Sequence, residues 1–492
     1  MVFSSYLFLF YFLPLALALY YAAPRRARHL VLTALSYVFY GWANPLFVVL
    51  LFVSTLIDYV CGLAIAQTHR RAGLLPEPGV PAALEGGIEP ARQPRAARAW
   101  LGVSLVSNLS LLGFFKYFNF GVENLNAIAG LTGLEALRLD SVLRVTLPLG
   151  ISFYTFQSMS YSWDVYRGRA AAIRSFVDFA CYVSMFPQLV AGPIIRFSEV
   201  ADQLRSRTHT FTKFARGVAF FSVGLAKKVV LANPCGKVAD LAFEAGSLTV
   251  LDAWTGVVAY AFQIYFDFSG YSDMAIGLGL MFGFVFAKNF DSPYLSQSIT
   301  EFWRRWHISL STWLRDYLYV PLGGNRKGPV RTYVNLSIVM LLGGLWHGAS
   351  WNFLVWGAMH GAMLALERAR GGEAAYGRLP GPVRTALVFV LVLFTWVFFR
   401  APDLPSAVGY LSWMFGAGEG AAGSGLVGGL IYQPYYLLTM VVAAFVVWRC
   451  PQTWDWTRTL TPARAVGVAA AFVAAAVMLT TQAFNPFIYF IF

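Results

Sequence analysis

Apolar segments recur along this entire chain, and they limit its fold more than any other feature does. Only 12% of the residues are charged, whereas a soluble domain carries about 25%. Because backbone polar groups in lipid must be satisfied within the chain, segments that cross a bilayer must be helical. The sequence therefore predicts an all-α polytopic membrane protein. The segments able to cross or partly cross a bilayer are 2–22, 30–43, 46–66, 99–119, 146–163, 176–195, 214–232, 252–283, 332–346, 351–366, 383–399, 430–448 and 465–482.

Several of these segments are shorter than the roughly 20 residues that a straight crossing requires. We expect about 11 transmembrane helices, and short re-entrant or interfacial helices around an internal cavity, because broken elements at membrane depth need protein or water around them. Stretch 72–98 is rich in Pro, Gly, Ala and Arg, and we interpret it as a flexible cytoplasmic loop. The Gly-rich stretch 416–429 is interpreted as another flexible connection. Neither is long enough to form a domain, so residues 1–492 are predicted to form a single membrane domain.

The net charge of +13 comes from short basic clusters between the apolar segments. That pattern is typical of cytoplasmic loops that orient spans and of surfaces facing anionic lipid, and it argues against binding to nucleic acid. Residues 1–23 carry no charge and precede a basic cluster, which predicts an uncleaved first span with its N-terminus outside. The basic clusters include Arg25, Arg26 and Arg28; Arg70 and Arg71; and Arg92, Arg95 and Arg98.

His347 lies in the apolar, glycine-rich stretch LLGGLWHGASWNFLVWGAMHG, where the only other ionisable group is His360. Burying an imidazole in a membrane is costly, so such a residue usually has a partner or a function. A neutral imidazole can accept a proton from a hydroxyl. The neighbouring glycines could serve close helix packing or could let a substrate approach. We interpret His360, near the end of its helix, as structural.

His307 lies in ITEFWRRWHISLSTWLRDYLYVPLGGN, whose apolar residues recur with the period of an amphipathic helix. The pattern predicts one helix that continues past His307 and ends at Pro321 and the glycines that follow. The helix is too charged to face lipid, so it would lie in the interface or line an aqueous cavity. A lone histidine on such a face is usually structural, but its similarity to the setting of His347 makes both candidates for function.

Other polar groups also occur in apolar surroundings. Asp267 and Asp273 lie in YFDFSGYSDMAIG, and further polar residues occur in SFYTFQSMSYSWDVYRG and FPQLVAGPIIRF. Carboxylates buried in a membrane usually pair with Arg or Lys. Arg304 and Arg305 are candidate partners, and a structural ion pair or hydrogen bond is the ordinary interpretation of these aspartates.

The sequence lacks the motifs that are typical of several enzyme classes. We find no Walker A loop, no dinucleotide-binding G-x-G-x-x-G, no H-E-x-x-H, no G-x-S-x-G and no CxxC. The four cysteines are scattered without metal-ligand spacing, so no metal site is expected. A transporter or channel, or a non-catalytic subunit of a polysaccharide export complex, remains an alternative. A transporter often contains inverted repeats, and no repeat is visible.

Taken together, these motifs resemble the membrane-bound O-acyltransferase (MBOAT) family, in particular its bacterial alginate O-acetyltransferase-like branch. The resemblance rests on the four motifs around His307, His347, Asp267 and Pro187, with FYGWANPLF near the start and FIYFIF at the end. It implies a ring of spans around a central funnel in the bacterial inner membrane. It also implies that His347 is catalytic and that His307 supports it.

The resemblance further implies an O-acyltransferase that moves an acyl group, expected to be acetyl, from a cytoplasmic thioester towards hydroxyls of an exported polysaccharide. Acetyl-CoA is the expected donor substrate, and no bound cofactor is expected. Transfer could be direct or could pass through a periplasmic partner protein, and D-alanyl transfer to a cell-wall polymer is the alternative. His307, Asn352 or a Trp N–H could stabilise the oxyanion. The candidate substrate-binding residues are Trp303, Arg304, Arg305, Trp306, Asp267 and Asn352.

Overall fold

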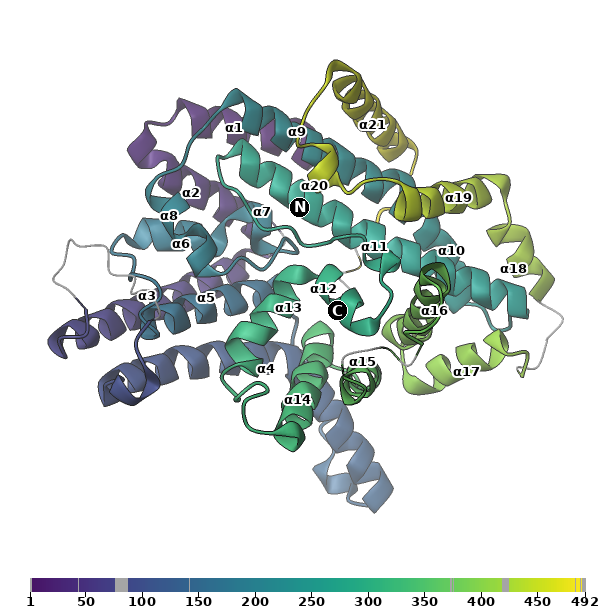
Figure 1. The fold of residues 1–492 in the computed structure, drawn as a ribbon, viewed down its shortest axis with the longest axis horizontal. Helices are drawn as coiled ribbons and strands as arrows, with labels where there is room; N and C mark the ends of the chain where they lie inside the picture. Colours follow the sequence, from purple (N-terminus) through teal and green to yellow (C-terminus); the bar gives the residue numbers. More distant parts are fainter. Residues whose placement is uncertain are drawn as a thin grey trace. The chain divides into compact units, whose positions relative to one another are not determined.

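The computed structural model describes residues 2–42, 44–75, 87–140, 142–371, 374, 376–417, 424–482, 484–486 and 488. Within these ranges every regular element is a helix, which confirms the all-α prediction (Figure 1). The described chain divides into two compact units. The first consists mainly of Leu7–Thr210, and the second mainly of Phe211–Met281 and Ala287–Phe492. That residues 1–492 act as one membrane domain stays a prediction.

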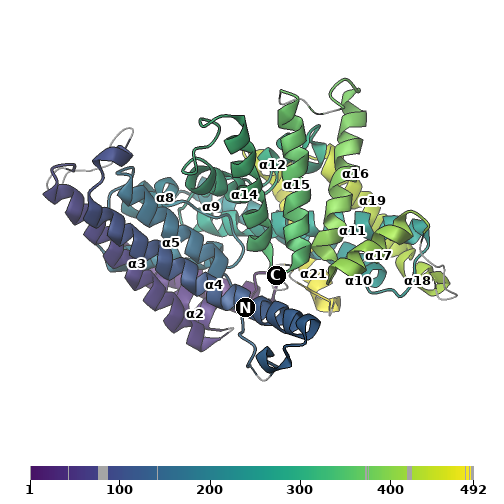
Figure 2. The same ribbon diagram turned by 90° about the horizontal axis from the view of Figure 1, so that it is seen from below.

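The first unit is built around long helices that pack along one another, α2 to α5 (Figure 2). A buried polar cluster joins three of them, because Asp58 accepts hydrogen bonds from Ser104 and Asn108, and Ser104 also contacts Ser162. Satisfying a buried carboxylate in this way makes its burial tolerable. The helices of this unit are α1 Leu13–Ala22, α2 Arg28–Gly41, α3 Pro45–Arg71, α4 Arg95–Thr132, α5 Ile151–Tyr166, α6 Phe176–Ser184, α7 Phe186–Leu189 and α8 Phe197–Arg205.

The second unit has α11 (Val250–Met281) at its centre, a helix buried along nearly its whole length. It crosses α9 (Phe211–Ala226) at glycines on both helices. A side chain added at Gly224 would meet the Gly270 carbonyl oxygen at 2.5 Å, and one added at Gly270 would meet the Gly224 oxygen at 2.7 Å. Small residues of this kind let two helix backbones approach closely.

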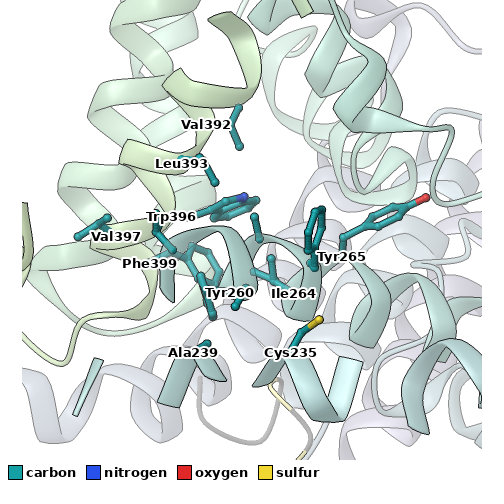
Figure 3. Packing of buried hydrophobic residues seen from close by; sticks show 14 of the residues in the cluster. Cys235, Ala239, Tyr260, Ile264, Tyr265, Val392, Leu393, Trp396, Val397 and Phe399 are labelled. Carbon is teal, nitrogen blue, oxygen red and sulfur yellow. The ribbon is translucent and has the colours of Figure 1, made fainter. Parts of the chain in front are cut away.

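The remaining helices of the second unit carry the residues of interest. Figure 2 shows α14, α15 and α16 side by side, and Figure 3 shows Trp396 and Phe399 of α16 packed towards Tyr260 and Ile264 of α11. These helices are α10 Asn233–Phe243, α12 Ile299–Arg305, α13 Ile308–Leu314, α14 Pro329–His347, α15 Trp351–Ala369, α16 Gly381–Arg400, α17 Leu404–Met414, α18 Ser424–Ile431, α19 Pro434–Arg449, α20 Thr453–Trp456 and α21 Pro462–Thr481, with π-helical turns at Lys227–Ala232 and Arg315–Tyr319.

Four of the described helices are long and apolar enough to cross a membrane: α3, α4, α16 and α21. Shorter apolar helices cover Leu7–Ala22 and Pro434–Arg449. The number of crossings, predicted as about 11, is therefore not confirmed by helix length and composition, because many of the apolar segments form shorter helices.

Two predictions about local structure are wrong. The predicted continuous helix through His307 is broken, since α12 ends at Arg305 and α13 begins at Ile308. Both predicted loops extend too far: residues 95–98 belong to α4, and residues 424–429 belong to α18. The centre of each loop, 76–86 and 418–423, lies outside the described residues.

Candidate active site

Two chain breaks bring His307 and His347 together in the second unit. His347 is the last residue of α14, where Gly348 takes an extended conformation that ends the helix. His307 joins α12 to α13 with φ 44° and ψ 55°. This left-handed conformation is costly for a residue other than glycine, and such strain concentrates at functional sites. The centroids of the two imidazole rings are 6.5 Å apart.

Asn289 holds the His307 ring in place. The Asn289 amide nitrogen donates to the Ser272 hydroxyl at 2.8 Å, which leaves its carbonyl oxygen as the acceptor. That oxygen lies 3.2 Å from His307 Nδ1 and 2.9 Å from the hydroxyl oxygen of Ser309. The Asn289 backbone oxygen also accepts from the backbone N–H of Ile308, which fixes the turn itself.

This arrangement selects one tautomer of His307. A carbonyl oxygen can only accept, so His307 Nδ1 carries the proton and donates it to Asn289. Nε2 then carries the lone pair, and it has no hydrogen-bond partner among the described residues. His307 is fully buried. Its Nε2 is therefore a base or hydrogen-bond acceptor that has been positioned and left available.

Aromatic rings surround His347. The ring centroids of Trp346, Trp356 and Phe399 lie 5.0 Å, 5.2 Å and 5.1 Å from that of His347. The Trp356 indole N–H is buried and has no hydrogen-bond partner among the described residues. A buried, unsatisfied donor costs free energy, so each one in a structure calls for an explanation.

The glycines around His347 serve packing between α14 and α15. A side chain at Gly344 would meet the Phe353 carbonyl oxygen at 2.2 Å, and one at Gly348 would meet the Phe353 ring at 2.1 Å. Gly343 differs, because a side chain there would reach only Leu314 at an ordinary contact of 3.4 Å. Of the two roles considered for these glycines, the geometry of Gly344 and Gly348 supports close helix packing.

His360 lies in the middle of α15 and not near the end of its helix as predicted, but its hydrogen bonds are those of a structural residue. It accepts a hydrogen bond at Nδ1 from the Trp303 indole N–H at 3.2 Å. Its Nε2 lies 3.1 Å from the Thr395 hydroxyl, so Nε2 carries the proton and both nitrogens are engaged. Trp303, proposed from the sequence as substrate-binding, is thus placed against His360.

The other predicted substrate residues have varied surroundings. Trp306 is buried, and its ring packs against Trp396 at 5.1 Å. Arg304 is exposed. Arg305 pairs with Glu301 at 2.8 Å, so the expectation that it would pair with an aspartate of YFDFSGYSDMAIG is wrong. The Asn352 side-chain amide donates to the Ala401 backbone oxygen at 2.7 Å, which ties α15 to the end of α16.

Asp267 is held in a buried ion pair with Lys228 at 2.6 Å. Its other oxygen accepts from the backbone N–H of Ile488 at 2.9 Å, and Lys228 also donates to the Pro486 carbonyl. The pair thus fastens the C-terminal segment into the second unit. Of the final FIYFIF, only Ile488 is among the described residues. Asp273 pairs with Lys227 at 2.7 Å, so both aspartates of this motif pair with lysines that the sequence analysis did not single out.

Comparison with known proteins decides the family. The chain is 45% identical over its full length, and over the full length of the relative, to a probable alginate O-acetylase of Pseudomonas putida. This chain belongs to the membrane-bound O-acyltransferase family. The model of that family matches residues 166–398, a range that contains both His307 and His347.

More distant relatives of this O-acyltransferase act on other polymers. A peptidoglycan O-acetyltransferase of Helicobacter pylori is 38% identical over 85% of this chain and 80% of its own length. A teichoic acid D-alanyltransferase of Streptococcus thermophilus is 28% identical over 45% of this chain and 57% of its own length. The family match and the named O-acetyltransferase relatives show that the protein is an O-acyltransferase, as the motifs predicted. Together with its apolar helices, they show that it is a multi-pass membrane protein.

Proposed function

We propose that this O-acyltransferase moves an acetyl group from a cytoplasmic thioester, acetyl-CoA, towards hydroxyls of an exported polysaccharide. The proposal places it in the bacterial inner membrane, with transfer either direct or through a hydroxyl of a periplasmic partner. Its full-length similarity to an alginate O-acetylase favours acetyl over D-alanyl, since the D-alanyltransferase covers less than half of the chain. The acceptor class is carried over from the relatives that act on alginate and peptidoglycan.

In the proposed reaction, a histidine of the pair removes the proton from the acceptor hydroxyl as its oxygen attacks the thioester carbonyl carbon. A carbon–oxygen bond forms, and the carbon–sulfur bond then breaks. The imidazolium returns its proton to the leaving thiolate, so the histidine ends neutral. General base catalysis of this kind typically contributes about 10²–10⁴-fold. We assign the base to His347, with His307 as the supporting group.

The observation that carries this proposal is the proximity of the two imidazole rings, whose centroids lie 6.5 Å apart. Within this pair, the lone pair of His307 Nε2 is oriented through Asn289 and has no hydrogen-bond partner among the described residues. An acceptor hydroxyl bound between the two imidazoles could donate to one and be positioned by the other. The Trp356 N–H, also without a partner in the described chain, is a candidate donor to the developing oxyanion.

The test is polymer acetylation in cells that carry His347→Ala, His307→Ala or the matched control His360→Gln. Histidine at 360 is equally buried in the same unit, but both of its nitrogens are engaged. We expect acetyl groups to disappear from the secreted polymer in the first two strains and to persist in the third, with protein level and polymer secretion unchanged.

Two outcomes would contradict the proposal. If acetylation survives His347→Ala and His307→Ala, the histidine pair does not carry the reaction. If secretion of the polymer stops together with acetylation, while the protein level is normal, a role in export or assembly explains the chain better than acyl transfer does.

A further inference from the structure

The first unit contains a solvent-open cavity of about 680 Å³ whose wall is basic. The wall is formed by the turn between α1 and α2 and by the chain that follows α8. Among the described residues, no carboxylate lines this wall. The lining residues are Tyr21, Arg25, Arg28, His29, Leu204, Arg205, Ser206, Arg207, Thr208, His209 and Thr210. The volume lies within the range of about 300–1,000 Å³ that small-molecule sites occupy.

A hydrogen-bond network connects lining residues of this basic cavity to the helices behind them. Arg207 donates to the Tyr20 hydroxyl at 2.7 Å and to His29 Nε2 at 2.5 Å. His29 Nδ1 lies 2.5 Å from the Asp178 carboxylate, and the Tyr20 hydroxyl lies 2.9 Å from His209 Nε2. The Asp178 carboxylate therefore pairs with His29. The hydrogen bonds of Arg207 and His209 hold the chain that follows α8 against α1 and α2. Preorganisation of this kind lowers the cost of binding.

Three further guanidinium groups of the wall have no ion-pair partner in the described part of the chain: Arg25, Arg28 and Arg205. Arg25 and Arg205 are exposed, and Arg28 is half-buried. The Arg28 guanidinium lies over the rings of Tyr20 and Tyr21, at 5.3 Å and 5.6 Å from their centroids. Stacking of this kind positions a guanidinium while leaving its N–H edge open.

We propose that this basic cavity is a binding site for a phosphate-bearing ligand. Guanidinium forks match phosphate oxygens in a bidentate manner, and several unneutralised cations around one cavity favour a multiply charged anion. Ser206 in the wall adds a hydroxyl group that can donate to phosphate. All of the lining residues belong to the first unit, whereas the histidine pair belongs to the second, and the binding of phosphate is proposed independently of acyl transfer.

Two sources could supply this phosphate. One is the headgroup of an anionic phospholipid, because basic clusters of this kind lie on the cytoplasmic side and attract anionic lipid. The other is a soluble phosphate-bearing molecule such as coenzyme A. Both use the same chemistry at the same arginines, and an experiment with two arms distinguishes them.

The experiment measures binding to the purified full chain in neutral detergent by calorimetry, at constant ionic strength. One arm titrates coenzyme A, and the other titrates a short-chain phosphatidylglycerol, with the matching phosphatidylcholine as the uncharged-headgroup control. The test variant is Arg25→Gln/Arg205→Gln, whose side chains are exposed and so should not disturb folding. The matched control is Arg70→Gln/Arg71→Gln, which removes the same charge from the end of α3 in the same unit.

We expect at least one probe to bind, with a Kd that rises about tenfold or more in the test variant and stays within about twofold in the control, since hydrogen bonds to charged groups are the strong ones. Loss in the coenzyme A arm identifies a soluble ligand, and loss in the phosphatidylglycerol arm identifies a lipid headgroup. If neither probe binds, or if test and control variants bind equally, the proposal is overturned. His347→Ala should leave this binding unchanged, so failure of the acyl-transfer proposal would be seen separately.

Discussion

His307 and His360 are buried to the same extent in the same unit, yet their surroundings differ in the one respect that matters for chemistry. Both are completely buried and ringed by aromatic side chains. His360 has a hydrogen-bond partner at each nitrogen, whereas His307 has one oriented nitrogen and one that lacks a partner among the described residues. Burial and aromatic neighbours therefore do not distinguish the two histidines, whereas their hydrogen bonds do.

The largest effect is expected from a variant that removes His307 Nε2. His307→Ala removes the group that positions the acceptor hydroxyl for His347 and should lower the rate of acyl transfer by about 100-fold, the cost of misplacing reacting groups. The rate is measured with purified protein and normalised to folded protein. A rate within threefold of wild type would mean that the lone pair at Nε2 has no role.

The second change acts on the orientation of His307 alone. Asn289→Leu removes the acceptor for Nδ1–H, which frees the ring to adopt the other tautomer. We expect a loss on the order of 10–100-fold, as for outer partners that orient metal-bound histidines. Asn289→Asp keeps an acceptor at that position and should restore most of the activity. Equal activity in the two variants would show that Asn289 does not set the tautomer.

The third change tests the packing that places His347. Gly344→Ala puts a methyl group against the Phe353 carbonyl oxygen and should destabilise the protein by about 1–3 kcal/mol, as overpacking does. Gly343→Ala is the matched control, because its methyl group would meet only Leu314 at 3.4 Å. Thermal unfolding in detergent measures both. If the two variants have the same unfolding midpoint, the packing between α14 and α15 is looser than the structure indicates.

The smallest effect is expected at His360. His360→Gln can keep hydrogen bonds to the same neighbours, so the rate should stay within about threefold and stability should fall by about 1 kcal/mol at most. Activity assays and unfolding midpoints check this. A loss of activity as large as that of His307→Ala would erase the distinction between the two histidines.

Part of the fold and of the candidate site could be predicted from the sequence. Low charge and recurring apolar segments predicted the helical membrane fold, and the motifs singled out His307 and His347 forty residues apart. The structural role of His360 was also predicted. These features depend on composition and local pattern, which a sequence displays directly.

The rest depends on tertiary contacts that carry no local signal. The amphipathic periodicity around His307 does not predict its φ of 44°, because periodicity shows which face of a helix is apolar and not where the helix breaks. Asn289 lies in an irregular stretch, and only the fold brings it to His307. The Gly-rich segment 424–429 is helical because α18 packs on α10 and α11, a contact that outweighs its weak helix propensity.

The histidine pair in the second unit is proposed to carry acyl transfer from a thioester. The most direct measurement is the release of free thiol from acetyl-CoA by the purified protein in the presence of an acceptor, which is the polysaccharide for direct transfer and the periplasmic partner for a relay. We predict that the wild type and His360→Gln release thiol at similar rates, and that His347→Ala does so at least about 100-fold more slowly. Thiol release by His347→Ala at the wild-type rate would contradict the account.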